Sequence, residues 1–116
     1  MASRRRKKKP PLENAEDSYC RKTYRTVGCS VVTFSQPRRT KQTPGIADLL
    51  VFDARSGTFW WHEVKRQQGE EWLKVGHGQT PEQEVFQKLV EAFGMTYILG
   101  SREAMFERLK KIGVLT

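Results

Sequence analysis

Three charged side chains in this sequence occupy positions where a folded core would not usually place a charge. Asp48 comes directly before the apolar run at 49–52, and Glu63 and Lys65 end a stretch at 58–65 that is rich in aromatic and β-branched residues. Successive side chains of a strand point to opposite faces, so Glu63 and Lys65, two positions apart, should share one face. Carboxylate and ammonium groups gathered in this way are suited to binding a cation and to stabilising negative charge.

The two apolar stretches should pair as an antiparallel hairpin across the turn at 54–57, whose sequence is Ala-Arg-Ser-Gly. That pairing would bring Asp48 close to Glu63, so that the two carboxylates could share one hard cation. Mg²⁺ takes oxygen ligands and keeps several waters, so two carboxylates and a main-chain carbonyl such as that of Val64 would be enough. Lys65, beside such an ion, could orient a water or stabilise the charge of a transition state.

The same residues also have a plain structural explanation. Glu63 and Lys65 could form an ion pair on an exposed edge strand, and Asp48 could simply mark the start of a strand. Their joint placement favours the functional explanation, because Pro-Gly-Ile-Ala-Asp at 44–48 leads into one strand and Trp-His-Glu-Val-Lys at 61–65 closes the next. The pattern therefore indicates a divalent-metal site.

The elements that must position this site follow from hydrophobic spacing and from capping residues. Helical periodicity predicts a helix from residue 12 to Gly28, and the β-branched stretch at 30–35 predicts a strand. The sequence Thr-Pro-Glu-Gln at 80–83 is a capping box that opens a second helix, which should end at Gly94. A strand at 95–99 follows, and Ser101 can cap a last helix with one apolar face. The order helix, three strands, helix, strand, helix predicts an α/β fold with helices on both faces of a mixed sheet.

Length and charge set the scale of the molecule and the kind of partner. A chain of 116 residues is enough for a single domain, and 21 Lys and Arg against 13 Asp and Glu give a net charge of +8, which favours polyanions. Six of these cations form one run at 4–9. We therefore expect a basic disordered tail at 1–11 that attracts phosphates, and one domain at 12–116. A merely solvated tail or an expression remnant would explain the run equally well.

Several classes of protein are not expected. The sequence has no apolar stretch long enough to cross a bilayer and no apolar segment after its basic start, so a soluble cytoplasmic protein is expected. Cys20 and Cys29 stand in no Cys-x-x-Cys pattern. We expect them to be reduced, buried thiols.

These motifs resemble those of the PD-(D/E)XK nuclease superfamily and, within it, the VRR-NUC domains, which occur alone in phages and bacteria or fused to larger repair nucleases. The resemblance spans roughly residues 12–112. The matching segments are Gly-Ile-Ala-Asp-Leu at 45–49, Glu-Val-Lys-Arg at 63–66, Thr-Pro-Glu-Gln at 80–83, and Gly94 before the last strand. The resemblance implies a restriction-endonuclease-like core of helix, three strands, helix and strand, with a C-terminal helix added.

The resemblance also implies roles for individual residues. Asp48 and Glu63 would bind Mg²⁺ or Mn²⁺, Lys65 would be catalytic, and Gln83 would support the site, although its place in a capping box needs no active site to explain it. A glutamate of the first helix often joins them. Glu16 is the candidate, since its spacing places it within the apolar stripe, and Glu13 is the alternative.

The activity implied is that of a metal-dependent DNA endonuclease selective for Holliday junctions, flaps or other branched DNA, working in DNA repair as a homodimer. Four cations near the motif in sequence would form a phosphate-facing rim unless they belong to a solvated loop: Arg38, Arg39, Lys41 and Arg66. The stretch at 66–79 is longer than the usual link in the family, which leaves substrate preference open. The alternatives are a non-catalytic nucleic-acid-binding module and a basic scaffold subunit of a larger assembly.

Overall fold

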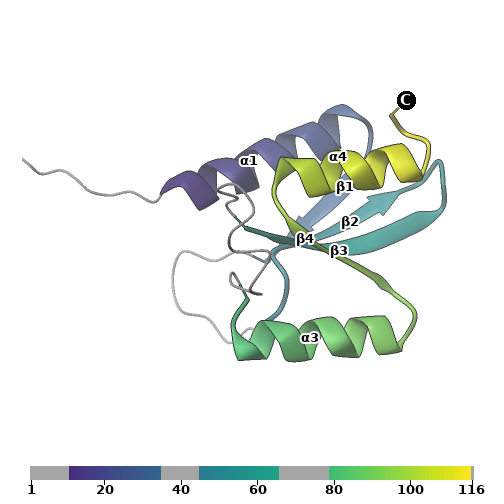
Figure 1. Cartoon of the computed structure of the whole chain (residues 1–116). Helices are drawn as coiled ribbons and strands as arrows, with labels where there is room; N and C mark the ends of the chain where they lie inside the picture. The colour runs from purple at the N-terminus through teal and green to yellow at the C-terminus, as the bar shows by residue number, and fades with distance from the viewer. Residues whose placement is uncertain (1–10, 35–44, 66–78, 116) are drawn as a thin grey trace, which may run out of the picture.

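The computed structural model describes residues 11–34, 45–65 and 79–115. Within them a four-stranded sheet is covered on one face by α1 (Pro11–Thr26) and α4 (Arg102–Lys111) and on the other by α3 (Pro81–Ala92), as Figure 1 shows. The predicted α/β order of elements is confirmed. Apart from Pro11, which begins α1, the expected tail at 1–11 lies outside the described residues, as does the stretch at 66–79 apart from Gln79. None of the described helices is long and apolar enough to cross a membrane.

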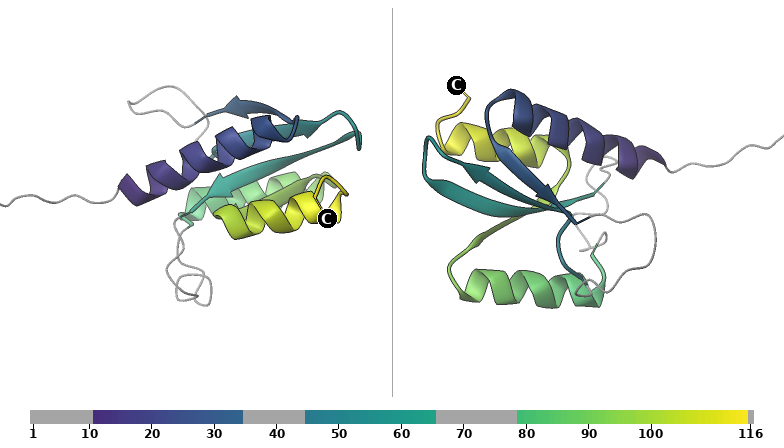
Figure 2. Two further views of the ribbon diagram at one scale, coloured as in Figure 1. Left: turned by 90° about the horizontal axis from the view of Figure 1, so that it is seen from above. Right: turned by 180° about the vertical axis from the view of Figure 1, so that it is seen from behind.

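The sheet is mixed, and its strands follow the order of the chain. The four strands are β1 (Ser30–Thr33), β2 (Leu49–Asp53), β3 (Thr58–Val64) and β4 (Thr96–Gly100). The β1–β2 and β2–β3 pairs are antiparallel, whereas β4 runs parallel to β3 because the chain returns through α3. The predicted hairpin is therefore confirmed, and β3 is an interior strand between β2 and β4. Figure 2 shows the sheet from above and from behind.

The main core lies between the sheet and the pair α1 and α4. On β2, Leu49, Val51 and Asp53 are buried, while the residues between them point to the other face, as a strand of period two requires. The buried apolar side chains of this core come from α1, the residue before β1, the two inner strands and α4: Cys20, Tyr24, Cys29, Leu49, Val51, Trp60, Val64, Met105 and Leu109. Both cysteines are free and buried, as predicted.

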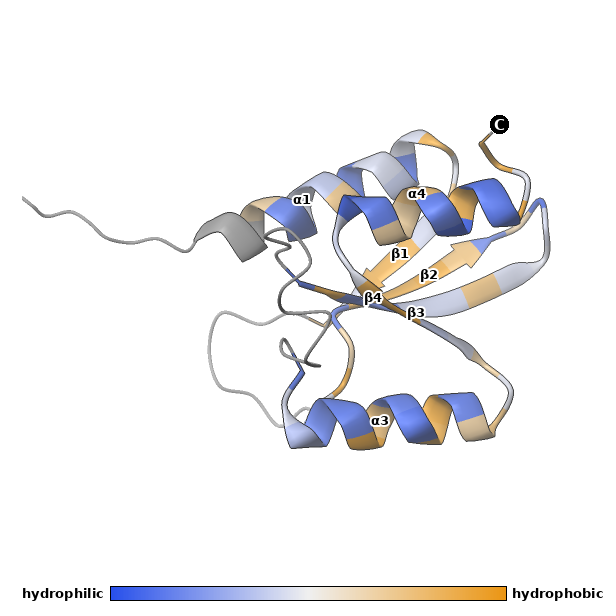
Figure 3. Cartoon of the chain, in the orientation of Figure 1, coloured by the Kyte–Doolittle hydropathy of each residue, from blue (hydrophilic) through white to orange (hydrophobic). Residues whose placement is uncertain are grey.

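A smaller core lies on the α3 face. Trp61 packs edge-on against Phe86 of α3, with ring centroids 5.0 Å apart, and the buried members of this cluster are Ala47, Val90 and Tyr97. Trp60 is fully buried on the opposite face. Adjacent residues of one strand thus serve the two cores, because successive side chains of a strand point to opposite faces. Figure 3 shows hydrophobic residues recurring along α3 and through the strands.

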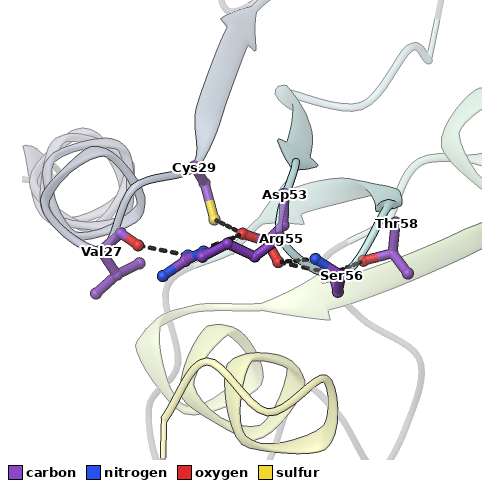
Figure 4. Close-up of polar contacts among 6 residues, drawn as sticks. All are labelled: Val27, Cys29, Asp53, Arg55, Ser56 and Thr58. Carbon is purple, nitrogen blue, oxygen red and sulfur yellow. Dashed lines mark hydrogen bonds and ion pairs between the residues drawn. The ribbon is translucent and has the colours of Figure 1, made fainter.

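At the far end of the hairpin, the carboxylate of Asp53 organises the turn (Figure 4). It accepts hydrogen bonds from the main-chain N–H and hydroxyl of Ser56, at 3.0 and 2.6 Å, and from the guanidinium of Arg55 at 2.8 Å. Arg55 also donates to the carbonyl oxygen of Val27 at 2.5 Å, at the end of α1. One buried carboxylate thereby joins the turn to the end of the first helix.

The helix starts agree with the sequence in one case and differ in the other. At α3 the capping box is confirmed: the main-chain N–H of Gln83 donates to the Thr80 hydroxyl at 3.1 Å, and that of Thr80 donates to the Gln83 side chain at 2.8 Å. Ser101 occupies the N-cap of α4, but its hydroxyl makes no capping bond. Its backbone dihedrals, φ −107° and ψ −136°, lie outside the β region usual for an N-cap residue, and the hydroxyl donates to the carboxylate of Glu103 at 3.1 Å. Ser101 therefore stands at the start of α4 as predicted, but the prediction that its side chain caps the helix is wrong.

Candidate active site

The hairpin brings Asp48 and Glu63 to the same end of the sheet. Leu49 pairs with His62 in the register of β2 and β3, which sets the preceding Asp48 beside the residue that follows His62. The main-chain N–H of Val64 donates to the Asp48 carboxylate at 2.9 Å. The predicted proximity of Asp48 and Glu63 is therefore confirmed. Just before β2 begins, the Asp48 carboxylate accepts the hydrogen bond that extends the β2–β3 pairing by one residue.

Glu63 is 1% exposed, which is unusual for a carboxylate and costs free energy unless partners compensate for lost hydration. Its Oε2 accepts a hydrogen bond from the Gln83 side-chain amide at 2.9 Å and lies 3.7 Å from the Lys65 ammonium. Glu63 and Lys65 thus share a face, as predicted. The alternative of an ion pair on an exposed edge is wrong, because β3 is interior and Glu63 is buried.

The side-chain amide of Gln83 serves the helix cap and the site at once. Its oxygen accepts the main-chain N–H of Thr80 at 2.8 Å, and its nitrogen donates to Glu63 at 2.9 Å. The cap therefore fixes which end of the amide faces the carboxylate. The two explanations that the sequence offered for Gln83 are compatible.

A buried chain of hydrogen bonds holds the backbone on the other side of β3. The carbonyl of Gly100 accepts the main-chain N–H of Lys65 at 3.2 Å and Nε2 of His62 at 2.9 Å. Since a carbonyl only accepts, His62 carries its proton on Nε2, and its Nδ1 accepts the Tyr24 hydroxyl at 2.8 Å. Trp60 donates to that hydroxyl at 3.2 Å.

Burial lowers the pKa of His62 to about 4, so the ring is neutral at neutral pH. Its side chain is fully buried and both ring nitrogens are hydrogen-bonded. His62 is therefore a packed histidine that ties β3 to α1 and β4, and not a general base.

Glu16 is paired with α4. Both its oxygens accept hydrogen bonds from the Arg102 guanidinium, at 3.1 and 2.8 Å, and Arg102 also stacks over the ring of Tyr19 at 3.9 Å. The hydrogen bonds from Arg102 hold the pKa of Glu16 below its usual range. The side chain of Glu13, the alternative candidate, lies outside the described residues.

The donors at the site suit a hard cation. Across residues 15–34, 45–65 and 79–115, no group of three or more His, Cys, Asp or Glu side chains could hold a metal ion. A metal would therefore rest on the carboxylates of Asp48 and Glu63, together with a main-chain oxygen such as that of Val64. This set contains only oxygen atoms, which fits Mg²⁺ or Mn²⁺, since these ions often bind through one or two carboxylates and keep waters or substrate phosphates as further ligands.

Some predicted residues lie outside the described part of the chain, and some neighbours of the site were not predicted. The predicted residues outside it are Arg38, Arg39, Lys41 and Arg66.

Tyr97 is a neighbour of the site that was not predicted. It pairs with Trp61 in the β3–β4 register, and its hydroxyl accepts a hydrogen bond from Gln79 at 3.2 Å. Burial, and then the nearby charges of Glu63 and Asp48, raise the pKa of Tyr97. Only the register between distant strands reveals this proximity.

No protein-family model and no curated protein matches the sequence. A solved structure described as "VRR_NUC domain" matches the fold with a TM-score of 0.60 and 21% sequence identity, over 86% of this chain and 95% of that one. The match covers nearly all of the known domain. The fold of this chain is therefore that of a VRR_NUC domain.

Proposed function

We propose that this chain is a divalent-metal-dependent endonuclease that hydrolyses phosphodiester bonds in DNA. The observation that carries the proposal is the meeting of Asp48, the buried Glu63 and Lys65 at one end of the sheet. A buried charge costs free energy, and a buried carboxylate with a second carboxylate and an ammonium group beside it, on a nuclease-type fold, is a mark of a functional site. A purely structural role would not need a buried carboxylate so close to a second one.

Each residue has a distinct part in the proposed reaction. Asp48 and Glu63, with the carbonyl of Val64, bind Mg²⁺ or Mn²⁺. A divalent cation, when bound there, supplies positive charge against the phosphate and makes a water a better nucleophile. Lys65 stabilises the negative charge that grows on the phosphate and orients the water. Gln83 holds Glu63 in place through the 2.9 Å hydrogen bond.

We propose branched DNA, such as a four-way junction or a flap, as the substrate. The net charge of +8 supports a polyanionic substrate, and the cations at 38, 39, 41 and 66 are the candidates for phosphate contacts. The preference for branched over linear DNA comes from the resemblance to junction-cleaving VRR-NUC domains. A direct comparison of the cleavage of branched and linear DNA tests this preference.

We also propose that the protein acts as a homodimer, which would let two sites cut opposed strands. Val85 and Leu89 of α3 and Phe93, which directly follows the helix, stand four residues apart and are 67%, 55% and 75% exposed. On the same face of the sheet, Phe52 and Phe59 stack with centroids 5.9 Å apart and are also exposed. Large apolar side chains gathered in this way support an interface, whereas single exposed ones do not.

The experiment that tests the nuclease is a cleavage panel of single-stranded, duplex, flap, splayed and four-way DNA with Mg²⁺ or Mn²⁺ at fixed salt. We expect cleavage of branched substrates that EDTA abolishes, and loss of cleavage but not of binding in Glu63→Ala and Lys65→Ala. Lys110→Ala, which removes an exposed lysine near the far end of α4, is the matched control. If the Glu63 and Lys65 variants cut as fast as the wild type, the site is wrong. Binding without any cleavage would favour the nucleic-acid-binding module.

A further inference from the structure

The backbone of Gly45 lies against the first turn of α3. A Cβ atom on Gly45 would lie 2.3 Å from the carbonyl oxygen of Glu82, 2.4 Å from its carbonyl carbon and 2.8 Å from the main-chain nitrogen of Gln83. These are backbone atoms, which cannot move aside as the end of a flexible side chain can. Gly45 also has a φ of +80°, a conformation that L-residues with a side chain rarely adopt.

This close approach joins the two segments that meet at the acidic pair. Gly45 stands three residues before Asp48, and the peptide group that it touches is the one that links Glu82 to Gln83. The side chain of Gln83 then reaches Glu63 at 2.9 Å. The position of the α3 backbone relative to the hairpin thus determines whether Gln83 can make that hydrogen bond.

We propose that Gly45 is a positioning residue of the active site, because its missing side chain lets α3 dock close enough for Gln83 to hold Glu63. Thr80 acts with it: the hydroxyl accepts the Gln83 main-chain N–H at 3.1 Å, and the Thr80 N–H turns the Gln83 amide so that its nitrogen faces Glu63. Gly45 sets the position of the turn and Thr80 sets the orientation of the side chain. The proposal deepens the proposed nuclease function and rests on it for its kinetic consequence.

The chain offers a closely matched control for Gly45→Ala. Gly94, at the other end of α3, also has a φ of +80°, but a Cβ atom there would meet nothing within 4 Å. Gly45→Ala and Gly94→Ala therefore both place a side chain at a φ of +80°, and only the first also brings a Cβ atom against backbone atoms of α3. A difference between the two variants then reports the close contact and not the positive φ.

The first readout needs neither metal nor DNA. In the metal-free protein, the side-chain amide resonances of Gln83 are assigned in a ¹⁵N–¹H spectrum by their loss in Gln83→Glu, a variant that keeps the capping residue type of the box. We expect Gly45→Ala to shift these resonances and Gly94→Ala to leave them in place. If the Gln83 resonances respond equally, or not at all, in both variants, Gly45 does not position Gln83 and the proposal is overturned.

The second readout is the steady-state kinetics of DNA cleavage, measured well below the melting temperature of each variant. A disturbed hydrogen bond to a charged group should lower kcat in Gly45→Ala by about tenfold or more, with KM for DNA within about twofold of wild type. We expect Gly94→Ala to keep both constants within about twofold of wild type. Equal kcat in the two glycine variants would contradict the proposal.

A second variant covers the case in which Gly45→Ala does not fold. Thr80→Val keeps the shape of the side chain but cannot accept the Gln83 N–H, and should shift the same amide resonances and lower kcat. Unchanged resonances in Thr80→Val would then overturn the proposal. An inactive wild type would contradict the proposed nuclease function, while the spectra would still decide whether α3 docking positions Gln83.

Discussion

At the scale of single residues, Asp53 carries a prediction about stability. Its carboxylate is 1% exposed and accepts hydrogen bonds from Ser56 and Arg55. Asp53→Asn replaces a charged acceptor with a neutral amide, and should lower the free energy of unfolding by about 2 kcal/mol at neutral pH. Urea unfolding of the two proteins measures the difference. Glu84→Gln, on the exposed side of α3, is the control and should change stability little.

The charge of Asp53 also predicts how the free energy of unfolding depends on pH. The hydrogen bonds from Ser56, and then those from Arg55, hold the pKa of Asp53 below its usual range in the folded protein. A carboxylate of this kind stabilises the fold above its unfolded pKa of about 4, and the stabilisation is lost as the pH falls through the lower folded value. The gap in unfolding free energy between wild type and Asp53→Asn should therefore narrow from about pH 7 to about pH 3. A constant gap would show that the charge is not what stabilises the turn.

The residues of the site could be predicted to different degrees from sequence. Glu63, Lys65 and the capping role of Gln83 follow from strand alternation and from a motif of four residues, both of which are local. The roles of Tyr97 and Gly45 depend on how segments more than 30 residues apart fit together, since Gly45 touches Glu82 and Tyr97 pairs with Trp61. No local pattern encodes such contacts.

At the scale of elements, the pair of Glu16 and Arg102 links α1 to α4. Their side chains are 19% and 42% exposed, so water screens the attraction and the coupling energy should stay below about 1 kcal/mol. A double-mutant cycle of Glu16→Gln and Arg102→Gln, followed by urea unfolding, measures that coupling.

The geometry of this pair also predicts how a substitution of Glu16 affects catalysis. Because Arg102 engages both oxygens of Glu16, we expect Glu16→Gln to cleave DNA within about twofold of the wild-type rate, unlike Glu63→Ala. A loss of about tenfold with intact stability would instead support the catalytic role that the family resemblance implies for Glu16.

The type and order of the elements were predictable because each helix and strand has its own periodicity and capping residues. The parallel placement of β4 also follows, since a strand, a helix and a second strand form a crossover. The hydrogen bonds at helix starts were less predictable. Thr80 caps α3 as its sequence indicates, but the hydroxyl of Ser101 bonds to Glu103. A cap also needs a backbone conformation that turns the hydroxyl oxygen toward the first turn, and sequence alone does not show that Ser101 lacks it.

At the scale of the whole molecule, the exposed apolar side chains of α3 predict the oligomeric state. Leu89→Glu places a charge in the middle of the stripe formed with Val85 and Phe93, and should convert a dimer to a monomer in sedimentation or light scattering. Lys88→Gln, an exposed change on the same helix that also lowers the charge by one, is the control and should leave the dimer intact. A wild type that is monomeric at high concentration would contradict the proposed homodimer.

The hydrogen bond from Val64 to Asp48 has a consequence for how the molecule assembles. It joins residues only 16 positions apart through a tight hairpin, whereas Gln83 and Gly100 reach β3 from 20 and 38 positions away. Short loops close at a smaller entropic cost, so the hairpin contacts are expected to form before the α3 and β4 contacts. During folding the two carboxylates would then meet before Gln83 arrives, and their mutual repulsion would slow that step. A divalent cation present in the refolding buffer would relieve this repulsion, which makes the folding rate a second, DNA-free measure of metal binding.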